Sequence, residues 1–234
     1  MISDSRDAAK KLRGVRFAFS ITALMTLAAP QTFAERETQT LSLEAEYEFK
    51  EILPKSCDLS GSFRQEKYID NIPRPLASEG DFLFACASGL IWRTTSPITE
   101  SVIFLNNGRI YLESNAELKK SNSVVMKTLS RLLLNMLSGD ASYFYHHFTL
   151  SRGVTDDITV ELTPKTKAFK RALKAIGLKT KESGIDLNIL DNSGQSTLIE
   201  ITSFIGNHDM SSADRCATQY ASSTEACDIL FAPQ

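Results

Sequence analysis

The chain has little of what enzyme active sites and nucleic-acid-binding surfaces require. Its 234 residues include only three histidines, and the sequence has neither a Gly-x-Ser-x-Gly turn nor a glycine-rich phosphate loop. Because no nucleophile, base and orienting acid can be identified, we predict that the protein is not an enzyme and needs no cofactor. Lysine and arginine number 26 against 28 aspartates and glutamates, so the charge excess typical of a nucleic-acid-binding protein is missing as well.

Long apolar runs are absent except near the start of the chain. There, a basic segment at residues 10–16 precedes an apolar run from Phe17 to Pro30, and small residues follow up to Ala34. This order is typical of a secretory signal peptide, and the run is shorter than the roughly 20 apolar residues that span a bilayer. We expect residues 1–34 to be cleaved, which removes five basic residues and two aspartates and takes the net charge from −2 to −5.

Cysteine is scarce too, with Cys57, Cys86, Cys216 and Cys227 as the whole set. In an exported protein an even number of cysteines indicates disulfides. A zinc site is the alternative, but only Cys216 and Cys227 lie moderately close in sequence, whereas zinc sites usually use two close pairs. The adjacent His146 and His147 lack a third ligand and are expected at a surface or helix end, so no metal is predicted.

The mature chain begins with one amphipathic helix, at Leu41–Leu53, and then changes to a period of two. Five strand-like runs follow, separated by turn residues such as Pro73-Arg74-Pro75 and Asn106-Asn107-Gly108. The predicted strands are Ser62–Ile69, Asp81–Ala85, Leu90–Thr94, Val102–Leu105 and Arg109–Glu113. Their spacing predicts an antiparallel meander.

A second amphipathic helix, from about Ser123 to Gly139, interrupts the strands, and a short helical turn at Asp140–His146 follows it. Five more strands are predicted: Phe148–Arg152, Ile158–Thr163, Ala175–Thr180, Ile185–Leu190 and Ser196–Phe204. We expect a mainly β domain over residues 35–205, a strongly curved antiparallel sheet or unclosed barrel with a helical lid. Residues 206–234 are expected to form a tail tethered by a disulfide.

Two predicted strands are apolar on both faces, at Phe82–Ala85 and Val102–Leu105. Such a sheet needs two covers. One face could be an ordinary core, while the helix at Ser123–Gly139 could close the other. The space between sheet and helix is then either packed protein or a cavity for an acyl chain, and periodicity does not decide between the two.

A series of short motifs resembles the LolA-like outer-membrane lipoprotein carriers in order and spacing. It runs through Gly61–Lys67, Ser78–Phe82, Gly89–Trp92, Ser96-Pro97 and Asn107–Tyr111, and continues more loosely to Phe204. The resemblance implies an unclosed barrel with a helical lid over an apolar cavity. It further implies a carrier that takes an acylated molecule, a lipoprotein or a glycolipid, across the periplasm of a Gram-negative bacterium. An inner-membrane delivery complex and an outer-membrane acceptor would be its partners, and it would act as a monomer.

The resemblance also implies which side chains face the cargo, when combined with alternation along the strands and the helix. These are Phe63, Phe82, Phe84, Leu90, Trp92, Val102 and Phe104 on strands and Val125, Leu129, Leu132, Leu133 and Met136 on the lid. The studied carriers place a lid-controlling arginine where this chain has Cys86. A lipid-sensing regulator and an enzyme on the same fold are the other hypotheses. The regulator is disfavoured because such proteins carry a second domain.

The predicted hairpin register fixes the disulfide connectivity. A bend near Asn71 and Ile72 pairs strand positions whose numbers sum to about 143, and Cys57 and Cys86 meet that condition. Opposed residues in an antiparallel ladder lie roughly 4.5–5.5 Å apart, within the range of a disulfide. We therefore expect Cys57 to bond to Cys86, and Cys216 to bond to Cys227 by exclusion.

Overall fold

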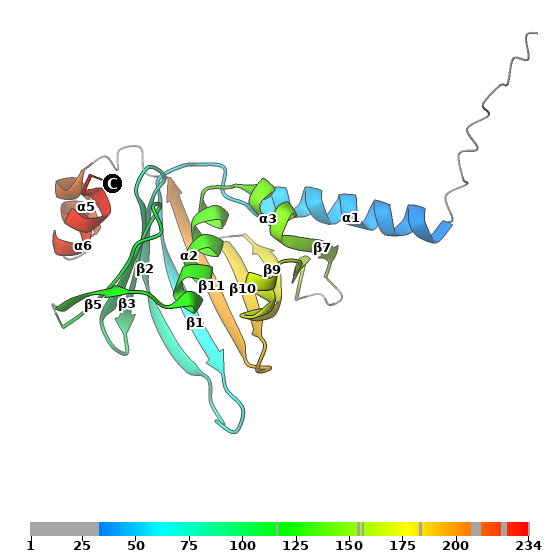
Figure 1. The fold of residues 1–234 in the computed structure, drawn as a ribbon, viewed down its shortest axis with the longest axis horizontal. Helices are drawn as coiled ribbons and strands as arrows, with labels where there is room; N and C mark the ends of the chain where they lie inside the picture. The colour runs from blue at the N-terminus through cyan, green and yellow to red at the C-terminus, as the bar shows by residue number, and fades with distance from the viewer. Residues whose placement is uncertain are drawn as a thin grey trace, which may run out of the picture.

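The fold is a single antiparallel sheet of eleven strands, curved around one apolar core (Figure 1). The computed structural model describes residues 33–115, 117–153, 155, 157–182, 184–206, 212–220 and 224–233. The strand order is β6-β5-β4-β3-β2-β1-β11-β10-β9-β8-β7, and the edge strands β6 and β7 do not pair with each other. The expected mainly β fold, an unclosed curved sheet with a helical lid, is therefore confirmed. Residues 1–32 of the predicted signal peptide lie outside the described residues.

The strands of the first half are β1 (Leu59–Tyr68), β2 (Leu76–Ala85), β3 (Gly89–Ser96), β4 (Glu100–Leu105), β5 (Ile110–Ser114) and β6 (Glu117–Ser121). Those of the second half are β7 (Phe148–Arg152), β8 (Val160–Pro164), β9 (Leu173–Lys181), β10 (Gly184–Asp191) and β11 (Ser196–Gly206). The pairing of β1 with β11 joins the two halves.

The helices are α1 (Phe33–Ile52), α2 (Val124–Leu137), α3 (Ala141–His147), α4 (Lys167–Lys170), α5 (Ala213–Tyr220) and α6 (Thr224–Phe231). Helix α1 packs its C-terminal part against β7 and α3, while its N-terminal part projects beyond the sheet in Figure 1. Among the described residues, none of these helices combines the length and apolarity of a membrane span.

Helix α2 lies across the concave face of the sheet, in the space between the two edge strands (Figure 1). It forms where the sequence predicted a helix, because Leu132, Leu133 and Met136 recur on one face and are buried against the strands. The Ser123 hydroxyl caps its start by accepting a hydrogen bond from the Met126 amide at 3.3 Å. Gly139 ends it in a left-handed conformation with φ of +72°.

The convex face of β2, β3 and β4 is covered by α5 and α6. Alternate residues of these strands point outward and form a second cluster, in which Cys216, Cys227 and Leu230 are completely buried. The strand members are Leu83, Ala85, Ile91, Ile103 and Leu105. In the predicted tail, α5 and α6 thus form a helical pair that has an apolar contact with the sheet besides the expected disulfide. This contact on the convex face explains why β2, β3 and β4 are apolar on both faces.

Both disulfides have the predicted connectivity, Cys57 to Cys86 and Cys216 to Cys227. The register prediction holds as well, because Leu59 pairs with Phe84 and Gly61 with Phe82. Each pair sums to 143. The first disulfide therefore ties the loop after α1 to the end of β2.

Candidate functional site

An apolar groove opens between α2 and the second half of the sheet. Its volume is about 270 Å³, and its walls come from β1, β9, β10, β11, α2 and α4. The apolar lining consists of Val125, Leu129, Leu132, Phe169, Ala172, Leu173, Ile189 and Ile199. Small-molecule sites typically occupy about 300–1,000 Å³, so the groove lies just below the size of a complete binding pocket.

One end of the groove is polar and charged. Gln65, Lys67, Asp191 and Thr197 surround this end, at the point where β1 and β10 finish. Partial burial of Asp191 tends to raise its pKa, but hydrogen bonds from Ser193 and the Gln195 amide outweigh this and lower the pKa. The Asp191 carboxylate therefore stays ionised. We call this end, where the β1–β2 hairpin, the β10–β11 turn and the N-terminus of α2 meet, the mouth.

The residues predicted to face the cargo divide into two groups. Val125, Leu129 and Leu132 line the groove, with Val125 66% exposed at the mouth. The other nine lie in or against the packed core beside it: Phe63, Phe82, Phe84, Leu90, Trp92, Val102, Phe104, Leu133 and Met136. A cargo-contacting role for these nine stays a prediction. Val102 lines a separate opening of about 290 Å³ beside β4 and β5, and the other eight are packed in the core.

Aromatic stacking fills the concave face of the first half of the sheet. The Trp92 ring stacks on Phe63 with centroids 4.0 Å apart and on Phe82 at 5.8 Å. Such contacts add about 0.5–1.5 kcal/mol each to the burial of the rings. The first half therefore supplies a firm wall, and the open volume is displaced toward β10 and β11. Ile189 on β10 and Ile199 on β11 line this open volume. Both lie within predicted strands, but nothing in the alternation of those strands marked them as facing open space.

The end of β2 is fixed at Cys86. Cys86 is bonded to Cys57, and its backbone amide donates to the Asp58 carboxylate at 2.9 Å. Asp58 itself has a positive φ of 57°, a conformation that aspartate tolerates better than most residues. The disulfide and the hydrogen bond together restrain this corner.

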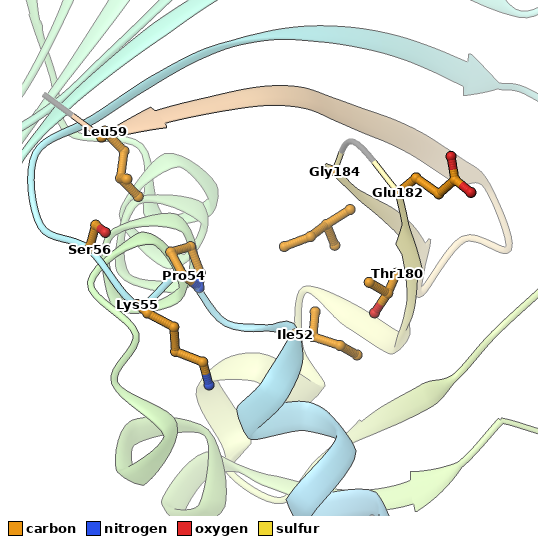
Figure 2. A pocket seen from close by; sticks show the side chains of 10 residues that line it. Ile52, Pro54, Lys55, Ser56, Leu59, Thr180, Glu182 and Gly184 are labelled. Atoms are coloured by element: carbon orange, nitrogen blue, oxygen red, sulfur yellow. The ribbon is translucent and has the colours of Figure 1, made fainter.

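A second opening of about 430 Å³ lies at the opposite end of the sheet, between the end of α1 and the β9–β10 hairpin (Figure 2). Ile52 and Leu59 form its apolar part, while Ser56, Thr180 and Glu182 form a polar border. In Figure 2 the Lys55 side chain turns back toward α1, where its ammonium donates to the Lys50 carbonyl and contacts Glu51. This polar border suits an acyl chain less well than the groove under α2.

The two adjacent histidines occupy the end of α3. His146 is exposed, and His147 packs its ring against Tyr143 and Phe169 with centroids 4.5 and 5.5 Å apart. Burial, assisted by nearby His146 and Arg131, lowers the pKa of His147. Nδ1 of His147 and the Tyr143 hydroxyl are buried without a hydrogen-bond partner among the described residues. The pair therefore belongs to the packing behind the groove, next to Phe169.

The family model for the outer membrane lipoprotein carrier protein LolA matches residues 55–214. This span includes all eleven strands and the lid helix α2. The chain belongs to the LolA family. The predicted resemblance is thereby confirmed, and the family points to a carrier-type role in binding lipoproteins. No curated protein sequence matches the chain.

Three solved structures are similar to the LolA-family chain described here. A LolA superfamily protein from Nitrosomonas europaea is 8% identical, with a TM-score of 0.40, and the match covers 74% of this chain and 94% of that one. An outer membrane lipoprotein-sorting protein domain from Vibrio parahaemolyticus is 11% identical, with a TM-score of 0.38 and coverages of 71% and 92%. A DUF1329 family protein from Desulfovibrio piger is 11% identical, with a TM-score of 0.37 and coverages of 77% and 98%.

Proposed function

We propose that this protein is a periplasmic carrier that shields the acyl part of a lipoprotein or another acylated molecule on its way to the outer membrane, and that it is not an enzyme. The groove under α2 is the observation that carries this proposal. Eight of its thirteen lining residues are aliphatic or aromatic, and Gln65, Lys67, Asp191 and Thr197 gather at one end. An acyl chain would lie under α2, and its polar head would remain at the mouth beside Lys67 and Asp191.

The groove must widen to take a whole acyl chain, and α2 is the element that can move. The C-terminal half of α2 buries Leu132, Leu133, Met136 and Leu137, whereas its first residues, Val124 and Val125, are exposed. The opposite wall is stiffened by the stacked rings around Trp92 and by the Cys57–Cys86 bond. Opening therefore proceeds by outward movement of the N-terminal half of α2.

Export and periplasmic location rest on the signal-like segment at residues 1–34 and on the two disulfides, which form and persist in oxidising compartments. Mature protein recovered from the cytosol with Met1 intact would contradict this part of the proposal.

The test is lipid extraction combined with a groove-filling variant. Protein purified from the periplasm is extracted with organic solvent and analysed by mass spectrometry, and we expect a stoichiometric acylated molecule. Ala172 lines the groove, so Ala172→Trp should fill it and reduce both the native cargo and the binding of a fluorescent fatty acid about tenfold or more. Ala77→Trp is the matched control, because Ala77 is exposed on β2 away from the groove. Equal retention of cargo and probe by both variants would show that acyl chains do not bind under α2.

A further inference from the structure

Exposed apolar side chains gather around the mouth of the groove. Val124 and Val125 stand at the start of α2, with 76% and 66% of their surface exposed. Tyr68, Ile72 and Leu76 add three more on the β1–β2 hairpin. Single exposed apolar residues need no explanation, but several at one end of a molecule indicate an interaction surface.

The topology brings these residues to the same end. Leu76 pairs with Lys67, which lines the mouth together with Val125. Ile98, also exposed, lies in the adjacent β3–β4 turn, just beyond Ser96, which pairs with Glu79 of β2. Figure 1 shows the β1–β2 hairpin reaching past its neighbouring strands at this end. The apolar side chains are therefore carried on separate projecting turns and on a helix start.

Cations surround these turns. Besides Lys67 they are Arg74 on the hairpin, Lys127 on α2, and Lys170 and Arg171 at the end of α4. Lys170 is placed beside the mouth because its carbonyl accepts a hydrogen bond from Asn192 in the β10–β11 turn, at 2.7 Å.

Two carboxylates, Asp70 and Asp191, lie next to these turns, against the five cations. Three others, Glu66, Glu79 and Glu100, lie farther along the strands. Glu66 is already paired with Arg64 at 2.6 Å. The mouth is thus locally basic in a chain whose formal net charge is −2.

We infer that the mouth docks directly on an anionic lipid bilayer, with Ile72, Leu76 and Ile98 entering the headgroup region while the lysines and arginines contact lipid phosphates. Projecting apolar side chains combined with basic residues are the pattern of peripheral membrane attachment. A protein partner fits less well, because the centres of protein interfaces are depleted of lysine. The inference deepens the proposed function, since docking would place the open end of the groove against the lipid surface.

Vesicle flotation tests the docking without any cargo. The full mature protein is mixed with phosphatidylcholine vesicles that contain or lack phosphatidylglycerol. We expect binding to the anionic vesicles that weakens as salt is raised. The double substitution Ile72→Ser/Leu76→Ser should reduce the partition coefficient more than tenfold. The substitution Lys127→Gln/Lys170→Gln should reduce it about fivefold for each lysine removed.

Matched controls come from the other end of the molecule. Ile205 and Leu43 are 59% and 60% exposed but lie away from the mouth, so Ile205→Ser/Leu43→Ser should leave vesicle binding unchanged. Lys50→Gln/Lys55→Gln is the corresponding charge control. Failure of the wild-type protein to bind anionic vesicles overturns the inference, and so does an equal loss in the control variants. If bare vesicles are not bound but native membranes are, through a cross-linked protein, the mouth is a protein interface instead.

The two proposals fail separately. A protein that binds anionic vesicles but yields no acylated molecule on extraction retains the docking surface and loses the carrier function. A protein that carries an acylated molecule but does not bind anionic vesicles retains the carrier function and loses the docking surface.

Discussion

Removing one anchor of the C-terminal helices, by Leu230→Ala, should detach them and leave the sheet folded. Leu230 is completely buried on α6 and packs in the cluster on the convex face with Leu83, Ile91 and Ile103. Truncating a buried leucine to alanine costs about 2–5 kcal/mol. The other members of this cluster on the two helices are small or only partly buried: Cys216, Cys227, Ala213, Ala217, Ala226, Ile229 and Phe231. Helices of this length are also not stable alone.

The disulfide limits how far the detached segment can loosen. With a sequence separation of 11 between Cys216 and Cys227, the chain-entropy relation gives a contribution of about 2.8 kcal/mol. The bond keeps the two helices together but does not fix them to the sheet. The loss of Leu230 therefore removes the largest fully buried side chain that the two helices place against the sheet. The core on the concave face is untouched, because Phe84, Leu90 and Phe104 belong to the other cluster.

Hydrogen exchange followed by mass spectrometry measures the effect directly. Amides of α5 and α6 should lose protection in the Leu230→Ala protein, while those of β1, β10 and β11 should keep it. Binding of a hydrophobic dye should rise, because the outward side chains of β2, β3 and β4 become accessible. The substitution Asp228→Ala, at an exposed position on the same helix, is the control. A uniform loss of protection across the sheet would refute the reasoning, since the helical pair would then be part of one cooperative unit.

Three further outcomes are expected. The substitution Cys57→Ala/Cys86→Ala should lower the free energy of unfolding by about 3.6 kcal/mol for a loop of 29 residues, measured by urea denaturation; an unchanged midpoint would contradict this. Leu90→Glu should unfold the protein rather than impair only cargo binding, because Leu90 is fully buried between Phe84 and Phe104 of the neighbouring strands. A folded variant with a native circular dichroism spectrum would count against this expectation. Because the pKa of His147 is lowered in the folded protein, the unfolded chain binds a proton at this imidazole more readily. Stability should therefore fall as the pH drops below about 6.5. Thermal melts of the His147→Gln variant should show a flatter dependence on pH.

The sequence sufficed for most strands and for α2, because their residues obey a simple period. Ten strands lie where they were predicted, with ends that shift by a few residues. The edge strand β6 was missed because Glu117, Lys119 and Lys120 leave it with little apolar alternation. Such charged edge strands are common, since lysines there prevent pairing with other molecules. Helix α1 begins at Phe33, before the predicted Leu41, because two glutamates, one glutamine and two threonines extend it without an apolar stripe.

The candidate site was only partly predictable. Alternation along a strand shows which residues share a face, but not whether that face meets a packed neighbour or open space. Leu90 and Ile199 have similar patterns, yet Leu90 is enclosed by neighbouring rings and Ile199 lines the groove. The difference arises from how α2 crosses the sheet, which depends on contacts between residues more than 50 positions apart. The disulfides were predictable because a hairpin register is local.

The distribution of apolar residues on the convex face explains why α5 and α6 cover only one half of the sheet. On β9, β10 and β11 that face is polar, with Lys181 bonded across the strands to Asp186 at 2.7 Å and to Glu200 at 2.9 Å. On β2, β3 and β4 it holds Leu83, Ile91 and Ile103. Left bare, this half would form an apolar patch that promotes association between copies. Helix α6 lies beyond the last residue of the family match, at 214. Because the cover lies on the convex face, the proposed entry and release of cargo under α2 would not disturb it.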